Sequence, residues 1–233
     1  MSLITAKGNQ AVESASQVKV DLTKAMIRLK DGESVKVRLL SSEDFVEYQA
    51  VASFGLGVYT QPSREPLGEK DYFVEAARLA EAKADGVDEK FKELYPRKRY
   101  LIALADVEQG VLRAWDASKS QFNNFVSALE EYKEIIDDKE EIVFNFKRTG
   151  TKTDTSYSLS PVMRPKKEDL EGFHKFDGAE ADIPFFESLL VPRTPELQVS
   201  VLKENGFPVE QYFPEVSLEE TAATDEVSPL DQI

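Results

Sequence analysis

The sequence predicts a mainly β protein with helical additions: a five-stranded antiparallel barrel, a helical insertion and a disordered acidic C-terminal tail. Three observations support this class. Apolar and polar residues alternate at period two in several short segments bounded by turn sequences. Stretches with helical spacing of apolar residues separate these segments. The last twenty residues carry six acids and no base, with too few apolar residues to form a core.

The length of 233 residues suits one large domain, or one medium domain with an appendage, and a hydrophobic content of 41% is enough for a core. We expect a flexible N-terminal segment at 1–25 and a barrel domain at 26–170, with its helical insertion at about 69–95. An extension at 171–213 is expected to pack on the barrel, followed by the acidic tail at 214–233.

The first strand follows a turn at residues 30–32. Its segment 35–39 alternates apolar residues with Lys36 and Arg38, which gives one apolar face and one positive face. Residues 45–60 form a second β-rich run, in which two glycines indicate a bulge or a close backbone approach.

Each of the later elements rests on a local pattern. Residues 69–95 predict one or two helices broken at Gly86, and residues 97–118 predict a hairpin that turns at 108–110. An amphipathic helix follows, capped by Ser118 or Ser120, and residues 142–159 predict a last hairpin. At least five β segments in about 160 residues fit a barrel of the oligonucleotide-binding type.

Composition weighs against several classes of function. Cysteine is absent, which excludes disulfides, thiolate zinc sites and a cysteine nucleophile. The single histidine, His174, lies in a polar connector, so no Ser-His-Asp triad is indicated, and no glycine-rich phosphate loop occurs. We expect no metal and no cofactor. With no apolar run near the roughly 18 residues of a membrane span and no signal peptide, we expect a soluble cytoplasmic protein with no membrane partner.

Charge is distributed unevenly along the chain. The net charge is −14, yet residues 171–233 alone hold 14 acids and 3 bases, so most of the acidity lies in the last quarter. Bases instead recur on the predicted strands, together with aromatic residues. Cations for phosphates and aromatic faces for bases are what single-strand binding requires. The residues predicted to bind nucleic acid are Lys36, Arg38, Tyr59, Arg97, Lys98, Arg99, Tyr100, Arg113, Trp115, Lys147, Arg148, Lys152 and Tyr157.

Several of these residues also have a structural interpretation. Trp115 is either a core residue or a stacking platform, and the cluster at 97–99 is either a phosphate contact or a solvated strand start. Phe144 and Phe146 are expected in the core. The co-occurrence of bases on nearly every strand favours nucleic-acid binding.

Three ordered motifs resemble the single-stranded-DNA-binding proteins of tailed phages, a family with the oligonucleotide-binding fold. They are "RLKDGESVKVRLL" at 28–40, "KRYLIALADVEQGVLRAWDAS" at 98–118 and "FKRTGTKTDTSYSLSPV" at 146–162. The resemblance implies a non-enzymatic protein of phage replication or recombination in the host cytoplasm. It also implies an acidic tail that recruits replication or recombination proteins and competes with DNA. Many members carry a cysteine-rich zinc insertion, where this chain has residues 69–95 without Cys or His.

Two alternative functions stay open. One is a protein-interaction adaptor on the same barrel, whose basic face meets an acidic partner. The other is a carboxylate-dependent nuclease, although the pattern of acids at 137–141 favours a solvated surface. The sequence does not indicate an oligomeric state.

Overall fold

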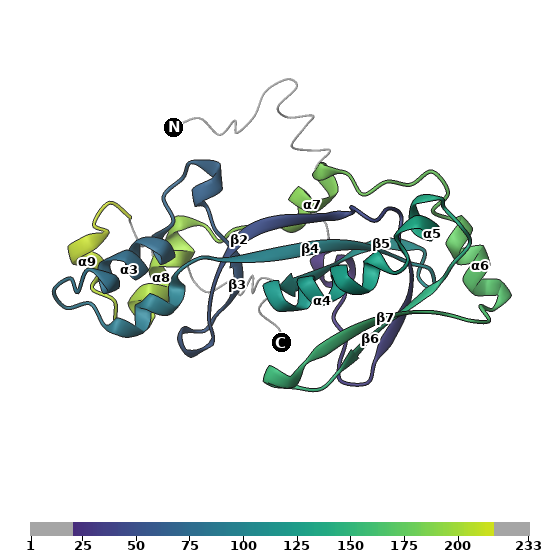
Figure 1. Cartoon of the computed structure of the whole chain (residues 1–233). Coiled ribbons are helices and arrows are strands. Elements are labelled where there is room, and N and C mark those ends of the chain that lie inside the picture. The colour runs from purple at the N-terminus through teal and green to yellow at the C-terminus, as the bar shows by residue number, and fades with distance from the viewer. Residues whose placement is uncertain (1–20, 217–233) are drawn as a thin grey trace, which may run out of the picture.

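The fold is centred on one antiparallel sheet of seven strands, as a computed structural model that describes residues 21–216 shows (Figure 1). The strands are β1 (Ser34–Arg38), β2 (Phe45–Ser53), β3 (Val58–Pro62), β4 (Arg97–Asp106), β5 (Val111–Ser118), β6 (Phe144–Thr149) and β7 (Ser156–Pro161). Their order is β3-β2-β4-β1-β6-β7, and β5 pairs with β4. The prediction of a mainly β, antiparallel protein with helical additions is confirmed.

Strand β4 is the centre of the sheet because three strands pair with it. Its first half pairs with β2, beginning with Arg97 opposite Ala50, and its last residues pair with β1. Strand β5 runs along the other edge of β4 over most of its length. The turn between β4 and β5 closes at Gly110, whose φ of 69° lies in the left-handed region that glycine adopts at no steric cost.

The prediction of a five-stranded barrel is not confirmed, because the sheet has seven strands and stays open between β5 and β7. Within residues 21–216 no ladder joins these two strands. The helix α4 (Lys119–Glu130) packs against both of them and buries Phe125 and Leu129. Trp115 of β5 reaches across to Tyr157 of β7, with 4.6 Å between ring centroids. The outer edge of β5 is partly taken by the N-terminal segment, whose Ile27 N–H donates to a β5 carbonyl at 2.7 Å.

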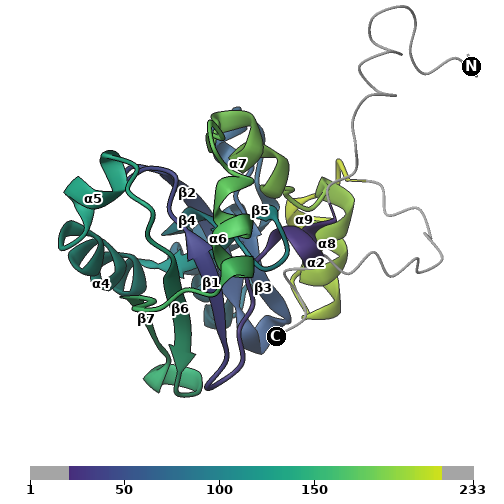
Figure 2. The same cartoon turned by 90° about the vertical axis from the view of Figure 1, so that its right-hand side faces the viewer.

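Helices gather at both ends and on both faces of the sheet. They are α2 (Leu22–Ala25), α3 (Tyr72–Glu81), α4, α5 (Lys133–Asp137), α6 (Lys167–His174), α7 (Ile183–Leu189), α8 (Pro195–Glu204) and α9 (Val209–Tyr212), with 3-10 turns η1 (Phe54–Leu56), η2 (Glu65–Leu67), η3 (Glu89–Leu94) and η4 (Lys152–Asp154). In Figure 2, α4 and α5 lie on one side of the strands, and α2 and α7 lie on the other.

The C-terminal extension divides among three places. Helix α6 packs on β1, and α7 buries Phe186 and Leu189 against the sheet face opposite α4. Helices α8 and α9 join α3 and η3 in one apolar core, which also includes Val51 and Val58 from the ends of β2 and β3. We call α3, η3, α8 and α9 the helical lobe; Figure 1 shows it at the β2–β3 end of the sheet. The predicted helical insertion is therefore completed by residues from the extension.

Local sequence explains where these helices begin. Ser118 caps α4 in a capping box, since its side chain accepts from the Gln121 N–H while the Gln121 side chain accepts from the Ser118 N–H. Asp71 caps α3 by accepting from two N–H groups of its first turn. Gly86, with a φ of 74°, separates α3 from η3, as the sequence predicted.

Asp44, in the connection between β1 and β2, makes stability depend on pH. Its half-buried carboxyl has a pKa of about 6, raised mainly by burial and further by the carboxylates of Glu180 and Asp137. A raised pKa in the folded state means that the contribution to stability is present at low pH and is lost as pH rises from about 4 to 6. Above that range the fold holds a carboxylate whose Oδ2 is buried without a hydrogen bond.

We expect Asp44→Asn to increase the free energy of unfolding at pH 7.5 by about 1–2 kcal/mol, after discounting the shift for partial exposure. At pH 4 the same substitution should change it little, because the carboxyl is already protonated. Urea denaturation at both pH values measures this difference. The matched control is the exposed neighbour Glu43→Gln; an equal gain at both pH values would contradict the assignment to Asp44.

Candidate nucleic-acid interface

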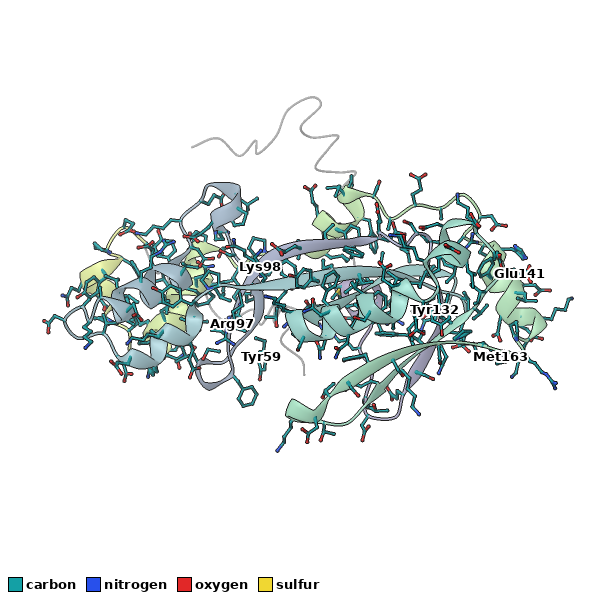
Figure 3. The ribbon with its side chains drawn as sticks, viewed as in Figure 1. Tyr59, Arg97, Lys98, Tyr132, Glu141 and Met163 are labelled. Carbon is teal, nitrogen blue, oxygen red and sulfur yellow. The ribbon has the colours of Figure 1, made fainter. Side chains whose placement is uncertain are left out.

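A pocket of about 660 Å³ lies where the start of β4 meets β2 and the first turn of α4. Figure 3 places Tyr59, Arg97 and Lys98 at this end of the sheet, next to the helical lobe. The pocket combines small, basic and neutral polar side chains. Its lining residues are Ala50, Ala52, Arg97, Lys98, Arg99, Ser118, Lys119, Ser120 and Asn123.

Strand register brings these residues together from three separate segments. Ala50 of β2 lies opposite Arg97 of β4, and Ser118 of β5 lies opposite Arg99. Because Ser118 is also the N-cap of α4, the helix begins directly where β5 ends. The first turn of α4 therefore lies beside the start of β4.

Two of the four cations in the pocket are already neutralised. The Arg99 guanidinium binds both carboxylate oxygens of Asp116, with Nε–Oδ1 at 2.9 Å and Nη2–Oδ2 at 2.8 Å. Burial alone would lower the pKa of Arg99, but the Asp116 carboxylate outweighs burial and raises it. Lys98 pairs with Glu47 at 2.9 Å, and this hydrogen bond raises the pKa of Lys98.

The other two cations are available to a ligand. Arg97 and Lys119 are both exposed, and neither makes an ion pair within the part of the chain that the structure describes. Four cations thus face two carboxylates around this pocket, and the excess positive charge lies on Arg97 and Lys119. Such an arrangement attracts a phosphate group.

The structure does not bring Lys36 and Arg38 to this pocket. Lys36 is held by Asp169 of α6 at 2.8 Å, and Arg38 is held by Asp177 at 2.6 Å. Arg38 also donates to the Phe173 carbonyl and lies 4.0 Å from the centroid of the Phe173 ring, and it is only 6% exposed. We predicted both residues as phosphate contacts; in the structure their charges anchor α6 to β1.

Arg113 and Trp115 are also internal. Arg113 binds Asp106 at 3.0 Å and the Met26 carbonyl at 2.8 Å, so it fastens the N-terminal segment to the sheet. Trp115 is 2% exposed, so it is a core residue and not a stacking platform. Its place among the predicted stacking residues must be corrected, because a base cannot reach a ring enclosed by other rings.

Tyr100 has a similar, partly structural role. Its ring stacks on Phe122 of α4, with centroids 3.9 Å apart and an interplanar angle of 4°, while its hydroxyl donates to Glu47. It thus joins the start of β4 to α4, beside the pocket.

The β6–β7 hairpin keeps part of its predicted basic surface. Arg148 donates to the Leu29 carbonyl at 2.6 Å, and Tyr157 stacks on Phe146, so both are committed within the fold. Lys147 is half-exposed and Lys152 is exposed; neither makes an ion pair within residues 21–216. Strand β7 packs beside α4, so the hairpin lies next to the helix whose first turn lines the pocket (Figure 1).

Sequence reasoning missed an exposed aromatic residue at the β2–β3 turn. Phe54 is 83% exposed, and its ring meets that of Tyr59 edge to face at 6.1 Å between centroids. The turn is held by Ser53, whose side chain accepts from the Leu56 N–H, and by Gly57 at a φ of 66°. We interpreted its glycines as a bulge or a close backbone approach and did not assign a role to the phenylalanine that precedes them.

Lys119, Ser120 and Asn123 were missed for a different reason. The sequence pattern of their segment indicates an amphipathic helix start, and nothing local shows that this start lies against β4. Only the ordering of β5 before α4, together with the pairing of β4 and β5, places them at the pocket.

Comparison with known proteins gives no independent identification. No protein-family model matches the chain, and a search of curated proteins gave no significant match. Across residues 21–216, no group of three or more His, Cys, Asp or Glu side chains is arranged to hold a metal ion. None of the helices described there is long and apolar enough to cross a membrane.

Proposed function

We propose that this protein is a non-enzymatic single-stranded-DNA-binding protein that acts in phage DNA replication or recombination. The observation that carries the proposal is the pocket at the start of β4, where Arg97 and Lys119 are exposed and, among residues 21–216, make no ion pair; Glu47, which pairs with Lys98, also attracts Lys119. Neutralising phosphates with such cations releases condensed counterions from the nucleic acid, which drives binding. Phe54 and Tyr59 add aromatic faces at the adjacent turn, on which bases of any sequence can stack.

We infer that the open sheet is a variant of the oligonucleotide-binding barrel. Strands β1, β4, β5, β6 and β7 contribute to one apolar core, as the five strands of that fold do. Helix α4 and the Trp115–Tyr157 contact occupy the gap where a β5–β7 ladder would close the barrel. In this interpretation the helical lobe is an addition to the barrel.

The acidic tail at 214–233 completes the proposal, although residues 217–233 lie outside the described part of the chain. Glu215, near its start, pairs with Lys70 at 2.5 Å, before the first turn of α3. The tail would compete with DNA for the basic surface as an intramolecular polyanion, and it would recruit replication or recombination proteins. Removing it should therefore increase affinity for DNA.

A titration of labelled oligo-dT, followed by fluorescence anisotropy at several salt concentrations, tests the proposal. We expect binding that weakens with salt at a slope of about −0.7 per phosphate contacted. A chain ending at Val216, which keeps the Glu215–Lys70 pair, should bind more tightly than the full chain. If neither chain binds even at low salt, the proposal fails and the protein-interaction alternative takes its place. Cleavage of the oligonucleotide on adding Mg²⁺ would instead support the nuclease alternative.

Phe54→Ala should weaken oligo-dT binding by about tenfold, because a stacked base contributes roughly 1–3 kcal/mol. The stability of the protein should hardly change, since the ring is 83% exposed. Anisotropy titration and thermal unfolding measure the two quantities. The control is Leu67→Ala, an exposed apolar residue in η2, which should leave affinity unchanged. Unchanged affinity in the Phe54 variant would remove this residue from the interface.

A further inference from the structure

The floor of the pocket is made of unusually small side chains. Ala50 and Ala52 both line it, although they lie on a strand, where larger β-branched or aromatic residues are the common choice. The space they leave open belongs to a pocket of about 660 Å³, within the range of roughly 300–1,000 Å³ that is typical of small-molecule sites. A surface that only attracted a phosphate backbone would not need this hollow.

Positive charge exceeds negative charge around the hollow. Lys98 and Arg99 are held by Glu47 and Asp116, which leaves Arg97 and Lys119 as the cations that can meet an incoming anion. The hollow is thus lined by the buried Ala50 and the half-buried Ala52, and by two exposed cations that make no ion pair in the described residues. Asn123 is exposed beside them, and its side-chain amide can both donate and accept a hydrogen bond.

We propose that this pocket is a seat for one nucleotide unit of the bound strand. The base lies against the half-buried Ala52, and the phosphate lies between Arg97 and Lys119, with Asn123 in a position to meet the base edge. The inference rests on the proposed function and deepens it, because it replaces diffuse contact with the backbone by one anchored position. It also gives each group a separate role: the floor acts on the base, and the two cations act on the phosphate.

The two roles can be separated with two variants and two strands. Ala52→Leu fills the hollow without changing charge, and the double variant Arg97→Gln, Lys119→Gln removes the cations without filling it. The probes are oligo-dT and an abasic strand of the same length, which has the phosphates but no bases. Gln49→Leu is the control for the leucine side chain itself, because it places the same apolar group at an exposed position of the same strand outside the pocket lining.

The seat predicts a distinctive pattern of results. Ala52→Leu should weaken oligo-dT binding by about tenfold or more, with an unchanged salt slope and unchanged affinity for the abasic strand. The double variant should weaken the binding of both strands and reduce the magnitude of the salt slope by roughly 0.7, because the seat holds one phosphate. Gln49→Leu should bind like the wild type. Thermal unfolding checks that each variant is folded, and Ala52→Val provides a milder filling of the same hollow.

The failures of the two proposals are distinguishable. If the wild-type chain binds neither strand at low salt, the proposed function fails and the seat fails with it. If the wild-type chain binds oligo-dT but folded Ala52→Leu and Ala52→Val bind equally well, DNA binding stands and the seat is overturned. Equal loss on the abasic strand in the alanine variants would also overturn it, because the floor would then act on the backbone and not on a base.

Discussion

Replacing Trp115 with alanine is expected to lower the free energy of unfolding by about 3–5 kcal/mol, a large part of the stability of a domain this size. The indole is 2% exposed and contacts three rings from three other elements: Phe125 of α4, Phe146 of β6 and Tyr157 of β7. Alanine would leave a cavity in the gap where the sheet is open. Because no backbone ladder closes this gap, ring packing holds β5 to β7 there.

Urea denaturation followed by circular dichroism measures this loss. Trp115→Phe is the informative control, because it keeps an aromatic ring and should lose less stability than Trp115→Ala. If the alanine variant were as stable as the wild type, the gap between β5 and β7 would have to be held by something other than this cluster.

The same burial has a consequence for binding measurements. Trp115 is the only tryptophan in the chain, so it dominates the intrinsic emission. Since its ring is enclosed, single-stranded DNA should change this emission little even at saturation, and a labelled oligonucleotide is the better probe. Strong quenching on DNA binding would show that the indole becomes accessible, in conflict with the packing described above.

The strands could be predicted because their signals are local. The alternation of Val35 and Val37 with charged neighbours identifies β1, and the turn sequence before Gly110 identifies the β4–β5 hairpin. The serines at 118 and 120 likewise indicate the start of α4, and the structure shows that Ser118 is the cap. The openness of the sheet could not be predicted in this way. It depends on whether β7 packs beside α4 or pairs with β5, which is decided by packing between segments that are distant in sequence.

The candidate site shows the same limit. Alternation correctly places Lys36 and Arg38 on the face of β1 opposite its apolar residues, but the sequence does not say what covers that face. The carboxylates that hold these cations come from about 130 residues further on: Asp169 lies in α6, and Asp177 lies in the turn after it. The residues that remain available, Arg97 and Lys119, stand out only because nothing in the described chain pairs with them. The local sequence therefore predicts on which face of a strand a cation lies. Whether that cation stays free to bind a ligand depends on the tertiary structure.

Gly172→Ala is the substitution expected to disturb α6 most strongly. A Cβ at this position would lie 2.0 Å from the Val107 carbonyl oxygen and 3.2 Å from the Val107 Cβ. The obstacle is backbone at the end of β4 and cannot rotate away, so α6 must move outward. We expect a loss of about 3 kcal/mol in the free energy of unfolding, at the upper end of the range for overpacking.

Helix α6 cannot move outward without weakening its polar contacts to β1. Asp169 and Phe173, which hold Lys36 and Arg38, lie on either side of Gly172 in the same helix. Hydrogen exchange should therefore show reduced protection in α6 before the central strands are affected. Glu171→Ala is the matched control: it is the adjacent residue, its side chain is exposed, and the one ion pair it makes among residues 21–216 is with Lys167 in the same helix. Should Gly172→Ala match Glu171→Ala in stability and in exchange, α6 would not pack against Val107, and the contacts of this helix with Lys36 and Arg38 would not depend on that packing.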